Sequence, residues 1–304
     1  MSLVRTKVAV LRGGGQPAYE ESLKTGNFVL NLLREKPEEY EPMDIFISRE
    51  GDWHHQGVVS DPYELLTKAH VVWNGLHSPG EHHKALESLK VPYIGSNLFS
   101  SNISHNKDLA KEIYIKHGIR TPDYSVVTSP DDELILIKTF KSKMPPFIVK
   151  PATGVRGIGI RIAHTFKELK EAVQKAFAHS PKVLVEEYVR GVVVTCGVVE
   201  GGRGQDLHAL VPMHIETDLK RVRPKPEDLK KVEDLAKLAH QVLGLRHFSS
   251  SDFIITPRSN IYILETNSSP LFHDDSIFHQ SLNASGWKPQ DFLEHCLNLA
   301  LNKI

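Results

Sequence analysis

Apolar positions recur with two spacings along the chain, and the first hundred residues show both. Short apolar runs predict buried β-strands at 7–11, 44–48, 71–73 and 93–94. Apolar side chains at helical spacing predict helices at 20–33, 63–66 and 83–89. Strands that alternate with helices are typical of an open α/β domain with a parallel sheet. We therefore predict a domain of this α/β class over residues 1–100.

The rest of the chain mixes strands and helices less regularly. Strands are predicted at 147–150, 160–162, 182–186, 192–199 and 208–215. Helices are predicted at 106–117, 166–178, 227–243 and 292–301. The apolar runs 251–256 and 261–267 flank a turn-forming segment, so they predict a β-hairpin. We expect an α+β half made of two further domains, 101–187 and 188–304.

The composition is that of an ordinary globular protein, and it narrows the range of partners. A length of 304 residues suggests two or three domains. The formal net charge of zero argues against nucleic acid or an anionic membrane as the main partner. The N-terminus lacks the apolar segment of a signal peptide, and no apolar run is long enough to span a bilayer. We therefore expect a cytoplasmic protein.

The predicted hairpin near the C-terminus carries three oxygen-bearing side chains. Glu265 and Asn267 are two residues apart, so on a strand they point to the same face. Asp252 lies on the neighbouring strand and could face the same spot. Oxygen ligands of this kind suit Mg²⁺ bound together with substrate phosphates. The alternative is that Glu265 and Asn267 merely end a strand and enter a loop.

A second candidate site is the glycine-rich segment 154–159, which joins two predicted strands. It is neither the dinucleotide fingerprint, which opens a helix, nor a P-loop. Glycines such as Gly154 and Gly157 let backbone N–H groups approach phosphate oxygens closely. Lys150 before the loop and Arg156 at its tip would add two cations. The alternative is a hairpin that binds no ligand.

The order of these features resembles the ATP-grasp family, and specifically the D-alanine–D-alanine ligases. Lys107 on a helix precedes Lys150 with its glycine hairpin, and the segment 183–187 and the carboxylate hairpin follow. The resemblance covers nearly the whole chain, with further matches at 8–14, 20–26, 74–77, 91–95, 118–122 and 264–270. It implies an ATP-grasp fold that binds ATP between two antiparallel sheets. It also implies that a carboxylate becomes an acyl phosphate, which an amine attacks to give an amide and ADP.

The resemblance also assigns residues to the nucleotide and its metal ions. Lys107 and Lys150 would contact the phosphates. Glu186 would take the adenine amino group, the backbone of Tyr188 and Val189 would lie beside the ring, and Leu264 would pack under it. Asp252, Glu265 and Asn267 would hold two Mg²⁺ ions, with Mn²⁺ as an alternative. His77 matches a histidine near the first substrate.

Several positions depart from the family pattern on the amino-acid side. The amine-binding glutamate falls on Ala18, the catalytic-loop serine on Arg156, the ribose glutamate on Val193, the oxyanion arginine on Ser250 and a small glycine on Leu271. The short basic segment 217–224 replaces a long lid loop; it is either a cationic lid or a solvated surface. We take Arg156, His77 and Glu20 as the candidate catalytic residues.

Three functions remain open. The first is an ATP-dependent ligase that forms D-alanyl-D-alanine for peptidoglycan. The second is a ligase of the same type for another amino acid or dipeptide, which Leu271 and Ala18 favour. The third is a catalytically weak homologue that binds nucleotide, although a pure scaffold has no need of the carboxylate hairpin. The resemblance also implies a homodimer and small amino-acid substrates.

Overall fold

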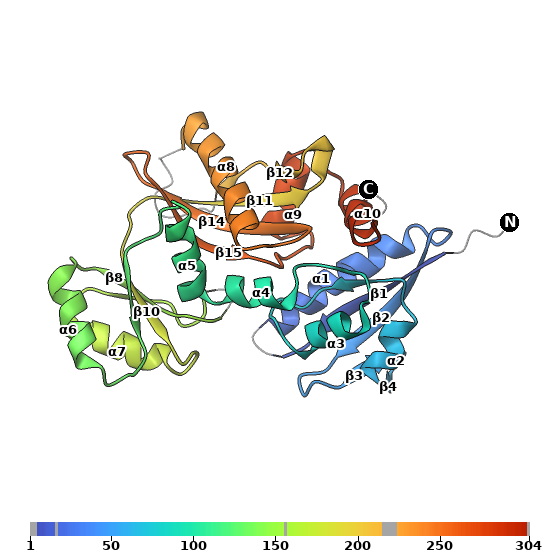
Figure 1. Cartoon of the computed structure of the whole chain (residues 1–304), viewed down its shortest axis with the longest axis horizontal. Helices are drawn as coiled ribbons and strands as arrows, with labels where there is room; N and C mark the ends of the chain where they lie inside the picture. Colours follow the sequence, from blue (N-terminus) through green and yellow to red (C-terminus); the bar gives the residue numbers. More distant parts are fainter. Residues whose placement is uncertain (1–4, 16–17, 155–156, 215–223, 303–304) are drawn as a thin grey trace.

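The computed structural model describes residues 5–15, 18–154, 157–214 and 224–302, and three β-sheets organise them. The first sheet and its helices lie at one end of the molecule in Figure 1, and the second sheet with α6 and α7 lies at the other end. The third sheet, with α8 across it, lies between these two ends. The helices α4 (Leu98–His105) and α5 (Lys107–Lys116) run from the first sheet to the second.

The first sheet has the strand order β4-β3-β2-β1-β5-β6. Its parallel strands are β1 (Thr6–Gly13), β2 (Tyr40–Ile47), β5 (Val71–Asn74) and β6 (Tyr93–Ile94). Its helices are α1 (Tyr19–Arg34), α2 (Pro62–Thr67) and α3 (Glu81–Leu89). In β1, Val8 and Val10 face one core cluster while Ala9 and Leu11 face another, because helices cover both sides. The predicted parallel α/β arrangement is confirmed.

Two parts of this region were not predicted. The antiparallel hairpin of β3 (Trp53–His55) and β4 (Val58–Val59) extends the sheet. It is an edge hairpin with exposed valines, so it lacks the apolar run that marks a buried strand. The polar segment 95–102, for which no helix was predicted, largely forms α4. The side chain of Asn97 caps this helix, and its serines are buried and donate or accept hydrogen bonds.

The second sheet is antiparallel, in the order β7-β10-β8-β9. Its strands are β7 (Tyr124–Val127), β8 (Phe147–Pro151), β9 (Arg161–Ala163) and β10 (Val183–Glu187). The helices α6 (Glu133–Ser142) and α7 (Phe166–Ala176) pack on it and complete a separate core cluster. The strands β8, β9 and β10 lie where they were predicted, to within two residues, whereas β7 and α6 were missed.

The third sheet has the order β12-β11-β14-β15, with β13 paired to β11. Its strands are β11 (Val192–Glu200), β12 (Leu207–Ala209), β13 (Met213–His214), β14 (Phe248–Ile255) and β15 (Ile261–Asn267). Its helices are α8 (Pro226–Val242), α9 (Ile277–Ala284) and α10 (Pro289–Ala300), and a short 3₁₀ turn spans Gly202–Gly204. The predicted β14–β15 hairpin is confirmed by its pairing.

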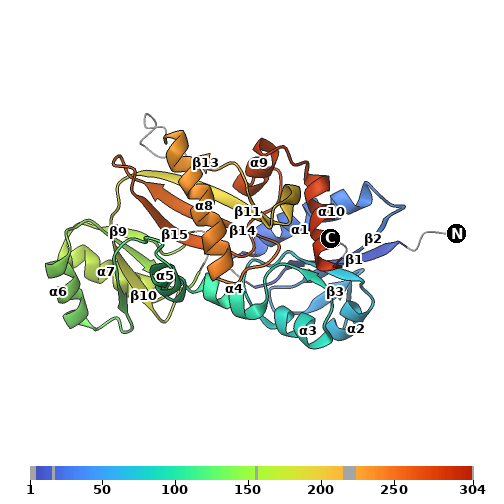
Figure 2. The ribbon, with the colours of Figure 1, turned by 45° about the horizontal axis from the view of Figure 1, so that its top comes forward.

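One core cluster joins the two ends of the chain. Val8, Leu30 and Trp73 from the first sheet and its helix pack with Phe272 and Phe292 from the last segment. In both views α10 lies against the first sheet and α1 (Figures 1 and 2). The division into 1–100, 101–187 and 188–304 stays a prediction. Among the described residues, no helix is both long enough and apolar enough to cross a membrane.

Candidate functional site

The hairpin of β14 and β15 brings together the three residues predicted to hold a metal ion. Asp252 pairs with Glu265 in the antiparallel register, and Asn267 follows two residues later on the same face. All three side chains line a cavity of about 480 Å³. The three residues predicted to share one site thus line one cavity, while their role as metal ligands stays a prediction.

A β-bulge at Leu264 determines which face Glu265 occupies. Ile263 pairs with Phe253, whereas the next paired residue is Glu265, so Leu264 is an extra residue without a partner. Ile263 is fully buried in the core beneath the sheet. In a regular strand Glu265 would follow Ile263 onto that apolar face, because side chains alternate with a period of two. The extra residue turns Glu265 into the cavity instead.

The two facing carboxylates repel each other. Burial, together with the nearby charge of Glu265, raises the pKa of Asp252 to about 7, although Thr195 opposes the shift by donating a hydrogen bond of 2.6 Å. A cation between the two carboxylates would remove this repulsion. The pair fits a divalent ion for that reason, with the side-chain oxygen of Asn267 as a further ligand.

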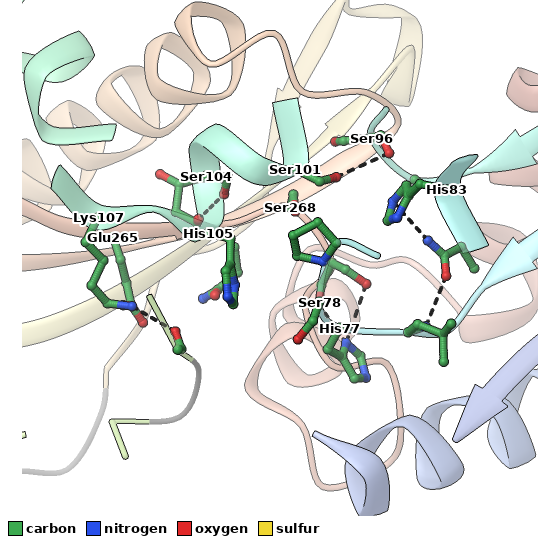
Figure 3. Close-up of a pocket in the computed structure, with 18 residues that line it drawn as sticks. His77, Ser78, His83, Ser96, Ser101, Ser104, His105, Lys107, Glu265 and Ser268 are labelled. Carbon is green, nitrogen blue, oxygen red and sulfur yellow. Dashed lines mark hydrogen bonds and ion pairs between the residues drawn. The ribbon is translucent and has the colours of Figure 1, made fainter. Parts of the chain in front are cut away.

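Lys107, at the start of α5, already places a positive charge beside this pair. Its Nζ lies 3.2 Å from Oε2 of Glu265 and donates to the carbonyl of Gly154 at 2.9 Å (Figure 3). The ammonium group therefore stands where a metal ion would contact Glu265. Within the described part of the chain, no group of three or more His, Cys, Asp and Glu side chains could hold a metal. The ion would need Asn267 and oxygens of a bound phosphate as well.

The first residues of the glycine-rich hairpin are fixed to the start of α5. The backbone N–H of Lys107 donates to the carbonyl of Ala152 at 2.8 Å. Gly154 and Gly157 have φ of 132° and 69°, in the region that favours glycine. Arg156 lies outside the described residues, so its catalytic role stays a prediction. Gly154 is thus held beside Lys107, whose ammonium group could contact a phosphate there.

A buried cluster of three charges connects α5 to the second sheet. Lys150 in β8 approaches Oε1 of Glu186 in β10 to 2.9 Å, and Lys111 in α5 approaches the same oxygen to 3.1 Å. Burial would raise the pKa of Glu186, but the two lysines together lower it. Burial lowers the pKa of Lys111 to about 8. A nucleotide that contacted Lys150 or Glu186 would have to replace one of the ion pairs in this cluster.

The other residues predicted near adenine lie in two places, after the end of β10 and at the bulge of β15. Tyr188 and Val189 directly follow β10, and the N–H of Tyr188 donates to the carbonyl of Pro146 at 3.2 Å. Tyr188 is exposed and Val189 is partly buried. Leu264, the bulge residue, is also partly buried. Their contacts with adenine stay predictions.

The candidate catalytic residues His77 and Glu20 lie in different environments. His77 lines the cavity, and its Nδ1 lies 2.9 Å from the carbonyl of Ser269. Glu20 is an exposed residue in α1 that pairs with Arg49 at 2.8 Å, and it does not line this cavity. Its neighbour Glu21 is buried and does line the cavity. The structure therefore brings Glu21, and not Glu20, to the site.

Three of the positions that depart from the family pattern line the same cavity. They are Ala18, Ser250 and Leu271. Leu271 adds apolar surface, and neither Ala18 nor Ser250 supplies a charge. The basic residues Lys220, Arg221 and Arg223 of the short lid lie outside the described residues, so their role stays a prediction. The described wall of the cavity is thus poor in cations, with Lys24 as its one lysine or arginine.

Sequence reasoning missed several polar residues of the site. In the sequence, Lys111 is an ordinary charged residue of an amphipathic helix, for which an exposed position is expected. Its burial beside Glu186 of β10 depends on a distant part of the chain. Thr195 reads as an ordinary strand residue. The pairing of Glu21 with His273, at 3.2 Å, spans most of the sequence and leaves no local signal. A charged residue on the apolar face of the predicted helix 20–33 was the one available hint for Glu21.

Comparison with solved structures defines the class of protein. The fold matches the VanG D-Ala:D-Ser ligase from Enterococcus faecalis with a TM-score of 0.87 and 22% identity, over 98% of this chain and 100% of that one. It matches the D-alanine–D-alanine ligase from Bacillus anthracis complexed with ATP with a TM-score of 0.77 and 23% identity, over 98% of both chains. The protein has the ATP-grasp fold, as the sequence predicted.

Comparison of sequences then identifies the family. The family model described as D-ala D-ala ligase C-terminus matches residues 113–220 and 212–298. The D-alanine–D-alanine ligase of Desulfotalea psychrophila is 29% identical, over 98% of this chain and 96% of that one. The chain belongs to the D-alanine–D-alanine ligase family, a family of ATP-dependent ligases.

Proposed function

We propose that the protein is an ATP-dependent carboxylate–amine ligase that joins two amino acids, the first of them D-alanine or a close analogue. The observation that carries the proposal is the shared cavity of Asp252, Glu265 and Asn267, with Lys107 beside it. These groups suit a metal-bound triphosphate. The same cavity extends to His77, Ala18 and Leu271, the positions that the resemblance places near the amino-acid substrates. Membership of the ligase family supports the same reaction.

The proposed reaction has two steps. The carboxylate of the first amino acid attacks the γ-phosphorus of ATP, which releases ADP and forms an acyl phosphate. The amine of the second amino acid then attacks the acyl carbon, and phosphate leaves as the amide bond forms. Catalysis of phosphoryl transfer is mainly positioning and charge stabilisation. In this chain Lys107 and Lys150 would hold phosphate oxygens.

Mg²⁺ would neutralise phosphate charge when bound at Asp252, Glu265 and Asn267. The chain's own carboxylates orient that charge, and Thr195 fixes Asp252 by its hydrogen bond. His77, held by the carbonyl of Ser269, faces the cavity next to the first substrate. The product would be D-alanyl-D-alanine or a related dipeptide for peptidoglycan, and a reaction that uses ATP fits a cytoplasmic location. A homodimer stays a prediction.

A ligase with a different second substrate is the competing form of this proposal. Leu271, Ile277 and Phe278 give the cavity an apolar side. Such a side favours an acceptor other than D-alanine. The relatives allow for this, since the match to a D-Ala:D-Ser ligase covers nearly the whole chain.

The deciding experiment measures ADP release with Mg²⁺-ATP across a panel of D- and L-amino acids, alone and in pairs. We expect turnover that requires D-alanine or a close analogue as one substrate. Tight nucleotide binding without turnover for any pair would contradict the ligase function. Turnover with D-alanine alone would remove the competing form with another acceptor.

The variant Glu265→Gln tests the metal assignment in the same assay. Loss of a group that stabilises charge in the transition state lowers turnover by roughly 10²–10³-fold, and we expect a loss of that order here. Titration with Mn²⁺ should show weakened metal binding in parallel. Unchanged turnover of Glu265→Gln would show that the metal lies elsewhere.

A further inference from the structure

A small group of buried hydroxyls lies beneath the carboxylate hairpin. Thr266 stands between Glu265 and Asn267 in β15, so its side chain points to the opposite face of the sheet. The hydroxyl of Tyr114 donates to Oγ1 of Thr266 at 2.8 Å, and Oγ of Ser251 lies 2.8 Å from the same atom. All three hydroxyl-bearing side chains are buried. The predicted metal ligands thus have a hydrogen-bonded group directly behind them.

This hydroxyl network joins the elements that carry the site. Tyr114 belongs to α5, the helix that begins at Lys107, while Ser251 and Thr266 belong to β14 and β15. Ser104, near the end of α4, donates to the backbone carbonyl of Thr266 (Figure 3). Both helices are therefore bonded to the hairpin at Thr266, which links the position of Lys107 to that of the hairpin.

Hydrogen bonds fix this junction more narrowly than apolar packing would. Tyr114 belongs to the core cluster that also contains Phe253 and Ile263, so an apolar side chain would suit its surroundings. A buried hydroxyl costs free energy unless it has a partner. Apolar side chains tolerate small shifts, whereas a hydrogen bond requires a narrow range of distance and angle. A satisfied network of this kind therefore favours one arrangement of the elements around it.

The same hydroxyls distinguish the observed strand register from the regular one. Because Leu264 is an extra residue, Thr266 pairs with Ser251. Without the bulge, Glu265 would stand opposite Ser251, and Thr266 would turn to the cavity side. The bonds from Tyr114 and Ser251 to Thr266 would then be lost, and a carboxylate would enter the apolar core. The hydroxyl network is therefore satisfied in the register that presents Glu265 to the cavity, and not in the regular one.

We propose that Tyr114 and Ser251 are positioning residues: through Thr266 they hold β15 in the bulged register that presents Glu265 and Asn267 to a metal-bound triphosphate. This inference rests on the ligase function proposed above and concerns how its phosphate site is kept in shape. The hydroxyls face the core and act through the geometry of the ligands. Loss of such supporting partners typically lowers metal affinity by roughly 10- to 100-fold.

The test removes the network without leaving an unpaired hydroxyl. A triple variant, Tyr114→Phe with Ser251→Ala and Thr266→Val, replaces the three hydroxyls by apolar groups of similar shape, which is nearly neutral for stability. Calorimetry measures binding of a non-hydrolysable ATP analogue with Mn²⁺, and binding of AMP. We expect the triple variant to bind the Mn²⁺–ATP analogue roughly 10- to 100-fold more weakly than wild type. AMP has no β- or γ-phosphate to reach the hairpin, so its binding should not change.

Hydrogen exchange of the ligand-free protein reports the register separately. In the triple variant the amides of β15 should exchange faster than in wild type, because the hairpin opens more often. Ser249→Ala is the matched control, since Ser249 is a buried serine on the same face of β14 whose hydroxyl bonds to His240 in α8. This control should lower stability but leave exchange in β15 and binding of the Mn²⁺–ATP analogue unchanged.

Wild-type affinity of the triple variant for the Mn²⁺–ATP analogue, or an equal loss of AMP binding, would overturn the inference. Tyr114→Phe alone keeps the pair of Ser251 and Thr266 and leaves no donor unpaired, so it serves if the triple variant does not fold. We expect it to weaken binding of the Mn²⁺–ATP analogue by roughly 2- to 10-fold, as for one hydrogen bond, and an unchanged affinity would again contradict the inference. A wild type that binds the analogue no more tightly than AMP would instead overturn the ligase function, whereas exchange in β15 still tests the network.

Discussion

Lys107, Glu186 and Glu21 share a property at the scale of single residues: each is already paired with an opposite charge. Lys107 pairs with Glu265, Glu186 with two lysines, and Glu21 with Lys24. Glu186 and its two lysines are buried, and removing one member of such a buried group costs about 3–5 kcal/mol, because an uncompensated charge remains. A ligand that contacts one of these residues therefore has to displace the partner that the residue has now.

Metal binding without nucleotide tests this exchange at Lys107. We expect Lys107→Met to bind Mn²⁺ about tenfold more tightly than wild type. The substitution removes the repulsion between the ammonium group and the metal ion, which is on the order of 1 kcal/mol. Calorimetry or Mn²⁺ electron paramagnetic resonance measures the affinity. Lys116→Met, at the exposed end of the same helix, is the control. Weaker or unchanged Mn²⁺ binding in Lys107→Met would contradict the competition.

The pH dependence of stability tests His83, which is buried in α3. Burial lowers the pKa of His83 to about 4, whereas an unfolded histidine titrates near 6.5. The unfolded state therefore binds more protons between these values, and stability is lost as the pH falls from 6.5 toward 4. From pH 7 to pH 5 we expect a loss of about 2 kcal/mol from this group.

Urea unfolding of wild type and His83→Gln at pH 7 and pH 5 measures the effect. Glutamine can still accept from Asn74, which lies 3.3 Å from Nε2 of His83, but it does not titrate. The difference between the two pH values should shrink by about 2 kcal/mol in the variant. It should persist in His164→Gln, which changes an exposed histidine. An identical pH dependence in His83→Gln would refute the assignment.

At the scale of elements, the connections between strands and helices decide where the site residues point. The turn from β1 into α1 brings α1 over the cavity, and Ser22 fixes it by accepting from the N–H of Gly13 and donating to the carbonyl of Gly75. Gly13 has φ of 93°, and a Cβ there would lie 2.2 Å from the carbonyl oxygen of Ile47. Only glycine fits this turn without displacing β2.

We expect Gly13→Ala to lower the free energy of unfolding by roughly 1–3 kcal/mol, through backbone strain and the clash with β2. Gly15→Ala is the matched control two residues later, because a Cβ there meets nothing within 4 Å. Urea unfolding measures both variants. If Gly13→Ala were as stable as Gly15→Ala, the backbone near Gly13 could move away from β2 without loss of unfolding free energy, and the expected clash would be absent.

The sequence predicts most elements but not the details that aim their side chains. Apolar runs predicted the parallel sheet, and turn residues predicted the β14–β15 hairpin, because burial leaves a local pattern. The bulge at Leu264 leaves none, and strict alternation from Ile263 would have put Glu265 into the core. Likewise, Lys111 and Glu21 are buried by parts of the chain far away in sequence. Such contacts depend on the packing of whole elements.

At the scale of the molecule, the charges predicted to hold ATP come from separate sheets. Lys150 and Glu186 lie in the second sheet, and Asp252 and Glu265 lie in the third. A ligand that contacts both sheets stabilises the folded state as a whole, by about 2.7 kcal/mol at 100 times its dissociation constant. AMP lacks the phosphates that would reach the carboxylate hairpin.

We therefore expect Mg²⁺-ATP to raise the midpoint of thermal unfolding well above that with Mg²⁺-AMP at equal concentration. Differential scanning fluorimetry measures the shift, and Glu265→Gln should reduce the response to ATP more than the response to AMP. Equal shifts with the two nucleotides would mean that the phosphates do not bridge the sheets.

The core cluster that joins Trp73 to Phe272 and Phe292 has a mechanical consequence. This cluster packs the first and third sheets against each other as one body, whereas the second sheet has a core cluster of its own. The chain passes between these two bodies only twice within the described residues, after α5 and between β10 and β11. The three sheets thus form two bodies, each with its own apolar core. We therefore expect that, if the nucleotide site closes on ATP, the second sheet rotates about those two crossings, against a body built from both ends of the chain.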